Sequence, residues 1–121
     1  MMLLQGERAL VESYFGCPVA DRYGCEEVGL IAAECEYHDG LHINDDHLVV
    51  EILREDGAPA GDGEVGQVVV TDLLNRGMPL IRYAVGDMSS WLPGACRCGR
   101  QMPRLARVLG RTEDFECVGQ H

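Results

Sequence analysis

The sequence predicts an α+β fold rich in β-structure, in which a short N-terminal helix and strand precede an antiparallel sheet or distorted barrel. Two observations support this prediction. One segment with helical apolar spacing precedes Gly16 and Pro18. Short apolar runs then recur at about ten-residue spacing, separated by turns rich in Gly, Asp and Pro, which is typical of antiparallel β-structure. At 121 residues, the chain fits one domain.

The expected helix spans Glu7 to Phe15 and ends at Gly16, with Pro18 just beyond. Its apolar residues fall on one face: Leu10, Val11, Tyr14 and Phe15. Residues 19–23 are expected to form a strand leading into a Gly-containing turn at residues 23–27. Ligands of open α/β sheets bind at such carboxyl ends of strands.

The rest of the chain predicts several strands. The expected segments are 29–35, 41–43, 48–53, a run centred on Val68–Val70, and 80–83, with a turn at residues 54–59. The last strand would deliver Asp87 at its far end, beyond Gly86. A carboxylate there could accept two hydrogen bonds from a vicinal diol such as a ribose, and the alternative is a solvated turn Asp.

Charge and hydropathy argue against several classes of function and location. The net charge of −10 argues against nucleic acid as a partner. All ten basic residues are Arg, so the chain has no Lys. No apolar run approaches the ~20 residues that cross a membrane. Residues 1–4 are apolar but lack the basic region and cleavage site of a signal peptide, so a cytoplasmic location is expected.

Cysteine and histidine spacing predicts a structural zinc site. Three thiols and one imidazole on separated turns make a tetrahedral ligand set: Cys35, His42, Cys96 and Cys98. His38 is the rival imidazole, and His42 is preferred because it lies in a strand-like segment. The alternative is that Cys35 is a small buried hydrophobe and His42 a surface residue. The remaining cysteines are expected to be ordinary buried or unpaired thiols: Cys17, Cys25 and Cys117.

Half of the positive charge lies in fifteen residues near the end of the chain. Pro103 argues against a continuous helix there. Four of these arginines are expected to form a surface that balances the acidic body: Arg97, Arg100, Arg104 and Arg107.

The stretch from Gly63 to Leu73, followed by Met78 to Asp87, resembles the core motif of the adenylate-forming enzymes, in the form of the phenylacetate–CoA ligases. Gln67 replaces a common acidic residue. This resemblance implies that Asp87 holds the ribose of the nucleotide. Several members of this family also carry Cys-x-Cys-Gly after the Gly-Asp motif, as Cys96–Gly99 does here.

Two further motifs support the same resemblance. Tyr23, Gly24 and Glu27 match the family's Tyr-Gly-x-x-Glu, which implies that Tyr23 and Gly24 line the adenine pocket and that Glu27 holds the Mg²⁺ that accompanies ATP. Gly110–Asp114 resembles the family's hinge before a small C-terminal domain. Arg111 is then implied to contact the ribose or phosphate, and Glu113 stands at the pivot, where Asp is usual.

The resemblance covers residues 6–115 and implies three regions: a helix–strand remnant of an α/β sheet (1–27), a distorted β-barrel (28–109) and a truncated hinge region (110–121). The complete enzyme would use ATP to convert a carboxylic acid into an acyl-adenylate and then a coenzyme A thioester. The family's phosphate loop and C-terminal lysine are not in this chain, so the chain alone is expected to be inactive. The alternative is a zinc-stabilised, non-catalytic module. An unpaired strand edge at 19–23 predicts a homo-oligomer.

Overall fold

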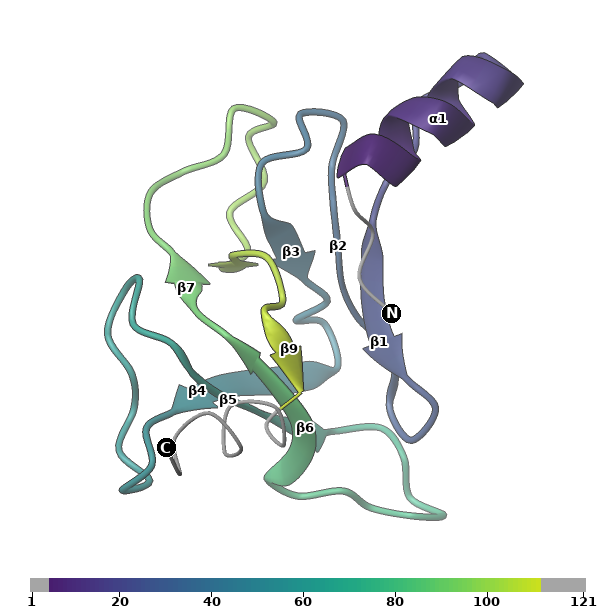
Figure 1. The fold of residues 1–121 in the computed structure, drawn as a ribbon. Coiled ribbons are helices and arrows are strands. Elements are labelled where there is room, and N and C mark those ends of the chain that lie inside the picture. Colours follow the sequence, from purple (N-terminus) through teal and green to yellow (C-terminus); the bar gives the residue numbers. More distant parts are fainter. Residues whose placement is uncertain (1–4, 112–121) are drawn as a thin grey trace.

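The computed structural model describes residues 5–111. One helix, α1 (Gln5–Phe15), precedes two antiparallel sheets (Figure 1). The first sheet has the order β1 (Arg22–Cys25), β2 (Gly29–Ala33), β3 (Leu41–Ile43), β8 (Arg104–Leu105), β7 (Trp91–Leu92). The second has the order β4 (Leu48–Leu53), β5 (Gly66–Asp72), β6 (Tyr83–Ser89), β9 (Gly110–Arg111). The β-rich α+β class is confirmed. Within residues 5–111 the sheets do not close into a barrel, so that part of the prediction is not confirmed.

The hydrophobic core lies between the two sheets and joins them. Ile31 and Leu105 from the first sheet and Val68 and Val70 from the second are fully buried. Removing this apolar surface from water is the main favourable term in folding. The β-branched run at 68–70 therefore forms the central strand expected of it, paired with β4 on one side and β6 on the other.

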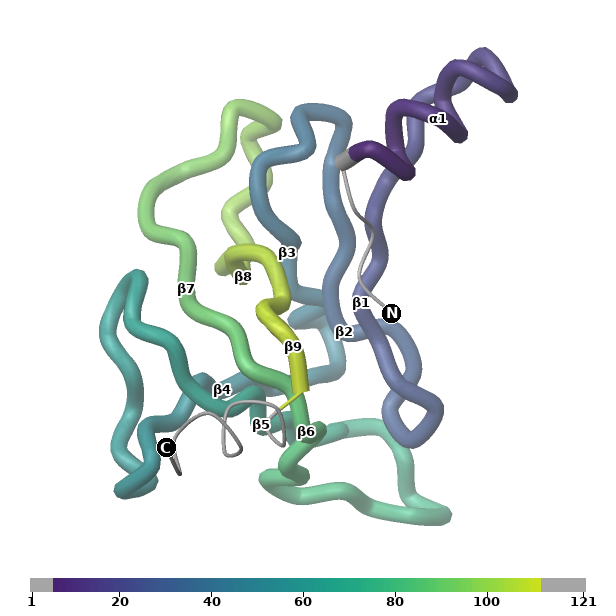
Figure 2. Tube along the Cα trace, viewed as in Figure 1, coloured from purple at the N-terminus to yellow at the C-terminus, as the bar shows by residue number. Residues whose placement is uncertain are grey.

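The chain passes from one sheet to the other at Ser90, where β6 leads into β7 (Figure 2). Just beyond this point, Trp91 pairs with Leu105 of β8. The Trp91 carbonyl also accepts a hydrogen bond from Gly63 N–H at 3.0 Å, in the loop before β5. Trp91 therefore lies where the two sheets meet.

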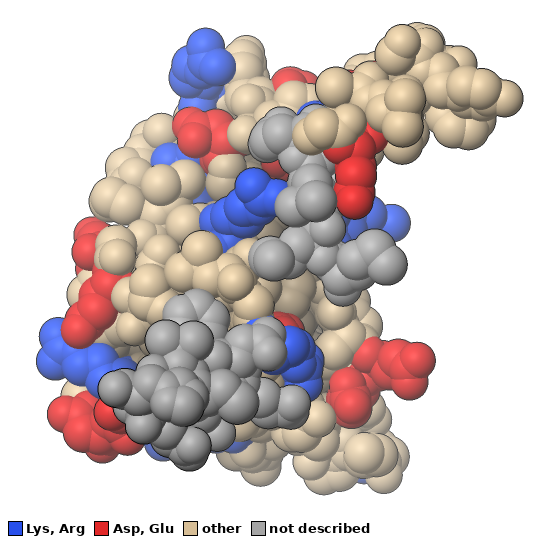
Figure 3. All heavy atoms as spheres, viewed as in Figure 1, with Lys and Arg blue, Asp and Glu red and all other residues tan. Residues whose placement is uncertain are grey.

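Helix α1 projects away from both sheets (Figure 1). Its expected bounds are nearly right, but its apolar face is not in the core: Leu10, Tyr14 and Phe15 are 71%, 82% and 68% exposed. Figure 3 shows the projecting helix as largely uncharged surface. Among residues 5–111 no helix is long and apolar enough to cross a membrane.

Two predicted strands begin later than expected. β1 begins at Arg22 rather than residue 19, and it pairs antiparallel with β2 through Cys25. β6 begins at Tyr83 rather than residue 80, because Arg82 has a left-handed φ of 50° that breaks the extended run before it. Asp87 consequently lies inside β6 and not beyond its end.

Strand β2 ends earlier than expected, at Ala33 instead of residue 35. The chain turns immediately afterwards, and His38 N–H donates to the Cys35 carbonyl at 3.1 Å. This turn places Cys35 outside the sheet, where its side chain can face another loop.

Candidate functional site

Four side chains gather where two loops meet at one end of the first sheet. The ligand atoms of Cys35, His42, Cys96 and Cys98 all lie within 4.8 Å of one another. Cys35 Sγ lies 3.6 Å from Cys96 Sγ, and Cys98 Sγ lies 3.5 Å from His42 Nε2. These are the four residues predicted from sequence spacing, so their convergence is confirmed.

The spacing of these donors suits a tetrahedral zinc ion. Zinc binds thiolate sulfur at about 2.3 Å, so two sulfurs of a tetrahedral site lie about 3.8 Å apart. The separation of 3.6 Å between Cys35 and Cys96 is close to that value. A set of three soft thiolates and one imidazole is also typical of structural zinc.

Electrostatics around the cluster favour metal-binding forms for some of its members. Burial, reinforced by the cations Arg100 and Arg104, lowers the pKa of His42 and keeps the imidazole neutral. Although burial opposes it, hydrogen bonding from Arg100 lowers the pKa of Cys98 and favours the thiolate. Burial raises the pKa of Cys35. Metal binding would have to displace that proton, which makes the affinity depend on pH.

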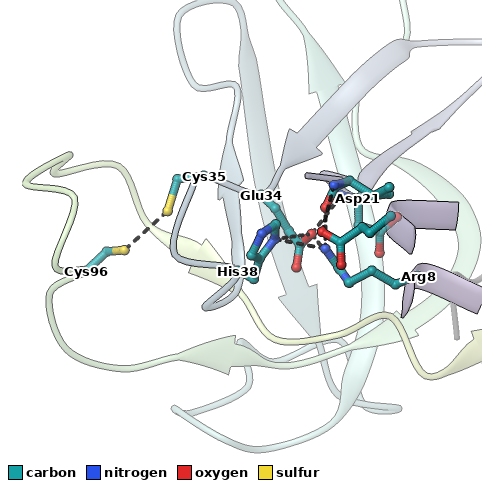
Figure 4. A network of polar contacts seen from close by, with 8 residues as sticks. Arg8, Asp21, Glu34, Cys35, His38 and Cys96 are labelled. Atoms are coloured by element: carbon teal, nitrogen blue, oxygen red, sulfur yellow. Dashed lines mark hydrogen bonds and ion pairs between the residues drawn. The ribbon is translucent and has the colours of Figure 1, made fainter. Parts of the chain in front are cut away.

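The rival imidazole, His38, belongs to a different group of contacts (Figure 4). Arg8 of α1 donates through Nη2 to Glu34 Oε1 at 2.6 Å and through Nη1 to His38 Nδ1 at 2.8 Å. Arg8 Nη1 also contacts the Val19 carbonyl, and Glu34 Oε1 accepts the Asp21 N–H at 2.7 Å. Because a guanidinium can only donate, His38 Nδ1 accepts. The structure therefore assigns His38 to the attachment of α1.

Arg104 does not lie on the charged surface expected of it. Its side chain is only 4% exposed, and Nη1 donates to the Asp39 carbonyl at 2.6 Å. Nη2 lies 3.4 Å from the Pro93 carbonyl and 3.3 Å from that of Gly94. Arg104 thus ties together the two loops that carry the cysteine–histidine cluster. Nη1 also lies 3.3 Å from the Asp39 carboxylate oxygen Oδ2. The surface prediction is wrong for this residue, because these partners in two loops hold its side chain in the interior.

A second site lies where β1, β6 and β9 approach one another, around a cavity of about 400 Å³. Tyr23 O–H donates to Asp87 Oδ2 at 2.7 Å, and Arg111 Nη1 lies 3.2 Å from Asp87 Oδ1. Asp87 and Arg111 are also register partners between β6 and β9. The family resemblance implies nucleotide-binding roles for four residues that all line this cavity: Tyr23, Gly24, Asp87 and Arg111.

Gly24 has a clear structural requirement at this position. A bulge interrupts the pairing of β1 with β2 between Tyr23 and Gly24. A Cβ at Gly24 would lie 2.4 Å from the Gly29 carbonyl oxygen. Only glycine allows this close approach, and the bulge re-aims the strand that carries Tyr23.

Glu27 follows β1 in an exposed turn and is not among the residues that line the cavity. Its own backbone N–H, together with hydrogen bonds from Cys25 and Tyr83, lowers the pKa of its carboxyl group. Glu27 is therefore ionised at neutral pH, as a Mg²⁺ ligand must be. Its role in holding magnesium stays a prediction. Glu113, the proposed pivot, and Cys117 lie outside the described residues.

Sequence reasoning missed several contributors to these sites. Cys25, Arg107 and Val108 also line the cavity around Asp87. Their approach depends on the crossing of the two sheets, which no local pattern reveals. The five cysteines of residues 5–111 are free, and Cys17 is exposed.

The chain is similar to curated phenylacetate–coenzyme A ligases and to a solved CoA ligase structure. No protein-family model matches the chain. It is 38% identical over 112 residues to a phenylacetate–coenzyme A ligase of Thermus thermophilus, covering 89% of this chain and 25% of the relative. It is 39% identical over 115 residues to that of Escherichia coli, covering 92% and 26%.

A solved structure is also similar: the open conformation of 2-hydroxyisobutyryl-CoA ligase in complex with 2-HIB-AMP and CoA. The match has a TM-score of 0.83 and 28% identity, and it covers 92% of this chain and 25% of that one. The chain belongs to the adenylate-forming family of ligases. Within it, the chain is phenylacetate–CoA ligase-like and spans about a quarter of the length of the curated relatives that it matches.

Proposed function

We propose that this chain provides part of the nucleotide-binding site of an ATP-dependent acyl- or aryl-CoA ligase. The observation that carries the proposal is the convergence of Tyr23, Asp87 and Arg111 from three strands on one cavity. The two contacts join positions separated by 64 and 24 residues. A carboxylate and a guanidinium side by side supply acceptors for ribose hydroxyls and donors for a phosphate.

The complete enzyme would work in two steps. A carboxylic acid attacks the α-phosphate of ATP, which forms an acyl-adenylate and releases pyrophosphate. The thiol of coenzyme A then attacks the acyl carbon and displaces AMP, which leaves the thioester. Asp87 would hold the ribose, Tyr23 and Gly24 would line the adenine pocket, and Arg111 would contact the ribose or phosphate. These groups act by holding the nucleotide in position.

Two metal ions belong to the proposal. Zn²⁺ would be bound by Cys35, His42, Cys96 and Cys98 and would be structural, because the cluster lies apart from the nucleotide cavity. Mg²⁺ would accompany ATP at Glu27, which offers a hard carboxylate oxygen. We also propose that residues 28–109 correspond to the β-barrel subdomain of the complete enzyme, with their two sheets open in this chain. Glu113 would mark the hinge, and the chain would self-associate in the cytoplasm.

Calorimetric titration with AMP tests the nucleotide site. The chain should bind AMP, and Asp87→Ala should weaken binding by at least tenfold, since a buried charged hydrogen-bond partner is lost. Asp46→Ala is the matched control, because Asp46 is an exposed aspartate whose side chain pairs with His47. Equal AMP affinity in all three proteins, or no binding to the unmodified chain, would refute the proposal.

The second candidate is a zinc-stabilised module that has no catalytic role. It is favoured by the Cys₃His cluster, whose four donors need no nucleotide to come together. Stoichiometric zinc in a folded protein without affinity for AMP or ATP would support this candidate over the first.

A further inference from the structure

We propose that the hydroxyl of Tyr23 is a positioning group that fixes the Asp87 carboxylate and thereby makes the pocket select a nucleotide with both ribose hydroxyls. This inference rests on the proposed nucleotide-binding function and extends it. The sequence motif assigns Tyr23 only to the lining of the adenine pocket. The structure adds a specific contact, Tyr23 O–H to Asp87 Oδ2 at 2.7 Å.

Strand pairing and packing against the core restrict the position of the Tyr23 hydroxyl. Tyr23 pairs with Ala32 of β2, which is fully buried, and its ring packs against the hydrophobic core. The adjacent bulge at Gly24 sets the direction of this strand. The phenol therefore approaches Asp87 from a fixed position in the other sheet.

The hydroxyl also keeps its proton. Burial and the neighbouring Asp87 carboxylate raise the pKa of Tyr23, so the phenol is a permanent donor at neutral pH. Rotation of an aspartate carboxylate about its last torsion is otherwise soft. A rigid donor on Oδ2 restricts this rotation and leaves the remaining lone pairs pointing in fixed directions.

Asp87 retains acceptor capacity for a diol. A carboxylate offers about four lone-pair sites. Tyr23 uses one on Oδ2 and Arg111 uses one on Oδ1. One site is left on each oxygen, which matches two adjacent hydroxyl groups. Of the two partners, Arg111 is the adjustable one, because its side chain is 55% exposed.

The experiment compares AMP with 2′-deoxy-AMP by calorimetric titration of the unmodified chain, Tyr23→Phe and Tyr14→Phe. Tyr23→Phe keeps the ring and removes only the hydroxyl. We expect it to weaken AMP binding about tenfold and 2′-deoxy-AMP binding much less, since one hydrogen bond to a charged group corresponds to about a factor of ten. The ratio of the two affinities should fall toward one. Tyr14 is 82% exposed on α1, so Tyr14→Phe should change neither affinity.

A second variant, Asp87→Asn, allows a double-mutant cycle with Tyr23→Phe. Asp87→Asn leaves Tyr23 in place and should also abolish the preference for AMP, and adding Tyr23→Phe to it should change the ratio no further. If Tyr23→Phe weakens both nucleotides equally, or leaves the ratio unchanged, the positioning role is overturned while nucleotide binding stands. If the unmodified chain binds neither nucleotide, the proposed function fails and this inference fails with it.

Discussion

Removing the proposed zinc ion should destabilise the protein strongly, because the cluster links segments that are far apart in the chain. Cys35 and Cys96 are separated by 61 residues. If the metal acts as a cross-link of that loop, the chain-entropy relation gives about 4 kcal/mol at 25 °C. Unfolding entropies of about 2 cal/mol/K per residue then translate this loss into a fall in Tm of about 15 °C for a chain of this size.

The assay is thermal unfolding with and without a strong chelator, together with metal analysis of the purified protein. Cys96→Ser and His42→Ala should lose zinc and melt at lower temperature. Cys17→Ser is the matched control, because Cys17 is exposed and outside the cluster, and it should keep its zinc. Protein without stoichiometric zinc, whose Tm ignores the chelator, would refute the reasoning. Loss of zinc in His38→Ala, with retention in His42→Ala, would show that the imidazole was assigned wrongly.

Four further predictions follow from contacts described above. Although burial opposes it, hydrogen bonds from the Asp21 N–H and Arg8 lower the pKa of Glu34. The ionised Glu34 carboxylate therefore stabilises the folded protein at neutral pH. This stabilisation is lost as the pH falls below about 4.3, the ordinary pKa of Glu. Urea unfolding at several pH values should show this loss of stability, and Glu34→Gln should remove this part of the pH dependence of the unfolding free energy. A Glu34→Gln variant with the same pH profile as the unmodified protein would contradict the prediction. A Cβ at Gly24 would lie 2.4 Å from the backbone carbonyl oxygen of Gly29, so in urea unfolding Gly24→Ala should destabilise by about 1 kcal/mol more than Gly77→Ala, where no backbone atom lies within 4 Å; equal losses would exclude the steric cause. The chain alone should show no ATP–pyrophosphate exchange with aryl or fatty acids because it has no Lys, and exchange above a no-enzyme control would disprove this. Sedimentation velocity should show a dimer or larger species, because β1 is an edge strand and α1 exposes its apolar face, whereas a monomer would rule this out.

The sequence was most informative where local pattern and chemistry coincide. The bounds of β3 and β4 match the expected segments, because each is a short, mainly apolar run with turn residues on both sides. The four cluster residues could be chosen because three thiols and an imidazole in this spacing match the ligand set of a structural zinc site. The family motifs likewise identified four residues that line one cavity.

The failures involve contacts that have no periodic signal. A buried arginine is indistinguishable from a surface one in the sequence, so neither the role of Arg8 nor that of Arg104 could be predicted. Asp87 was placed beyond a strand because Gly86 resembles a turn residue. In the structure Gly86 instead has a φ of 94° within β6, next to the guanidinium of Arg111. These arrangements depend on how the sheets cross.

The position of Trp91 provides a natural spectroscopic probe. It is the only tryptophan in the chain, so tryptophan fluorescence, excited selectively over tyrosine, reports on one position. That place is the meeting of the two sheets, beside β8, whose Arg104 ties the cluster loops together. Stopped-flow fluorescence of Trp91 should therefore follow separation of the sheets, and the proposed binding of zinc, in real time without an introduced label.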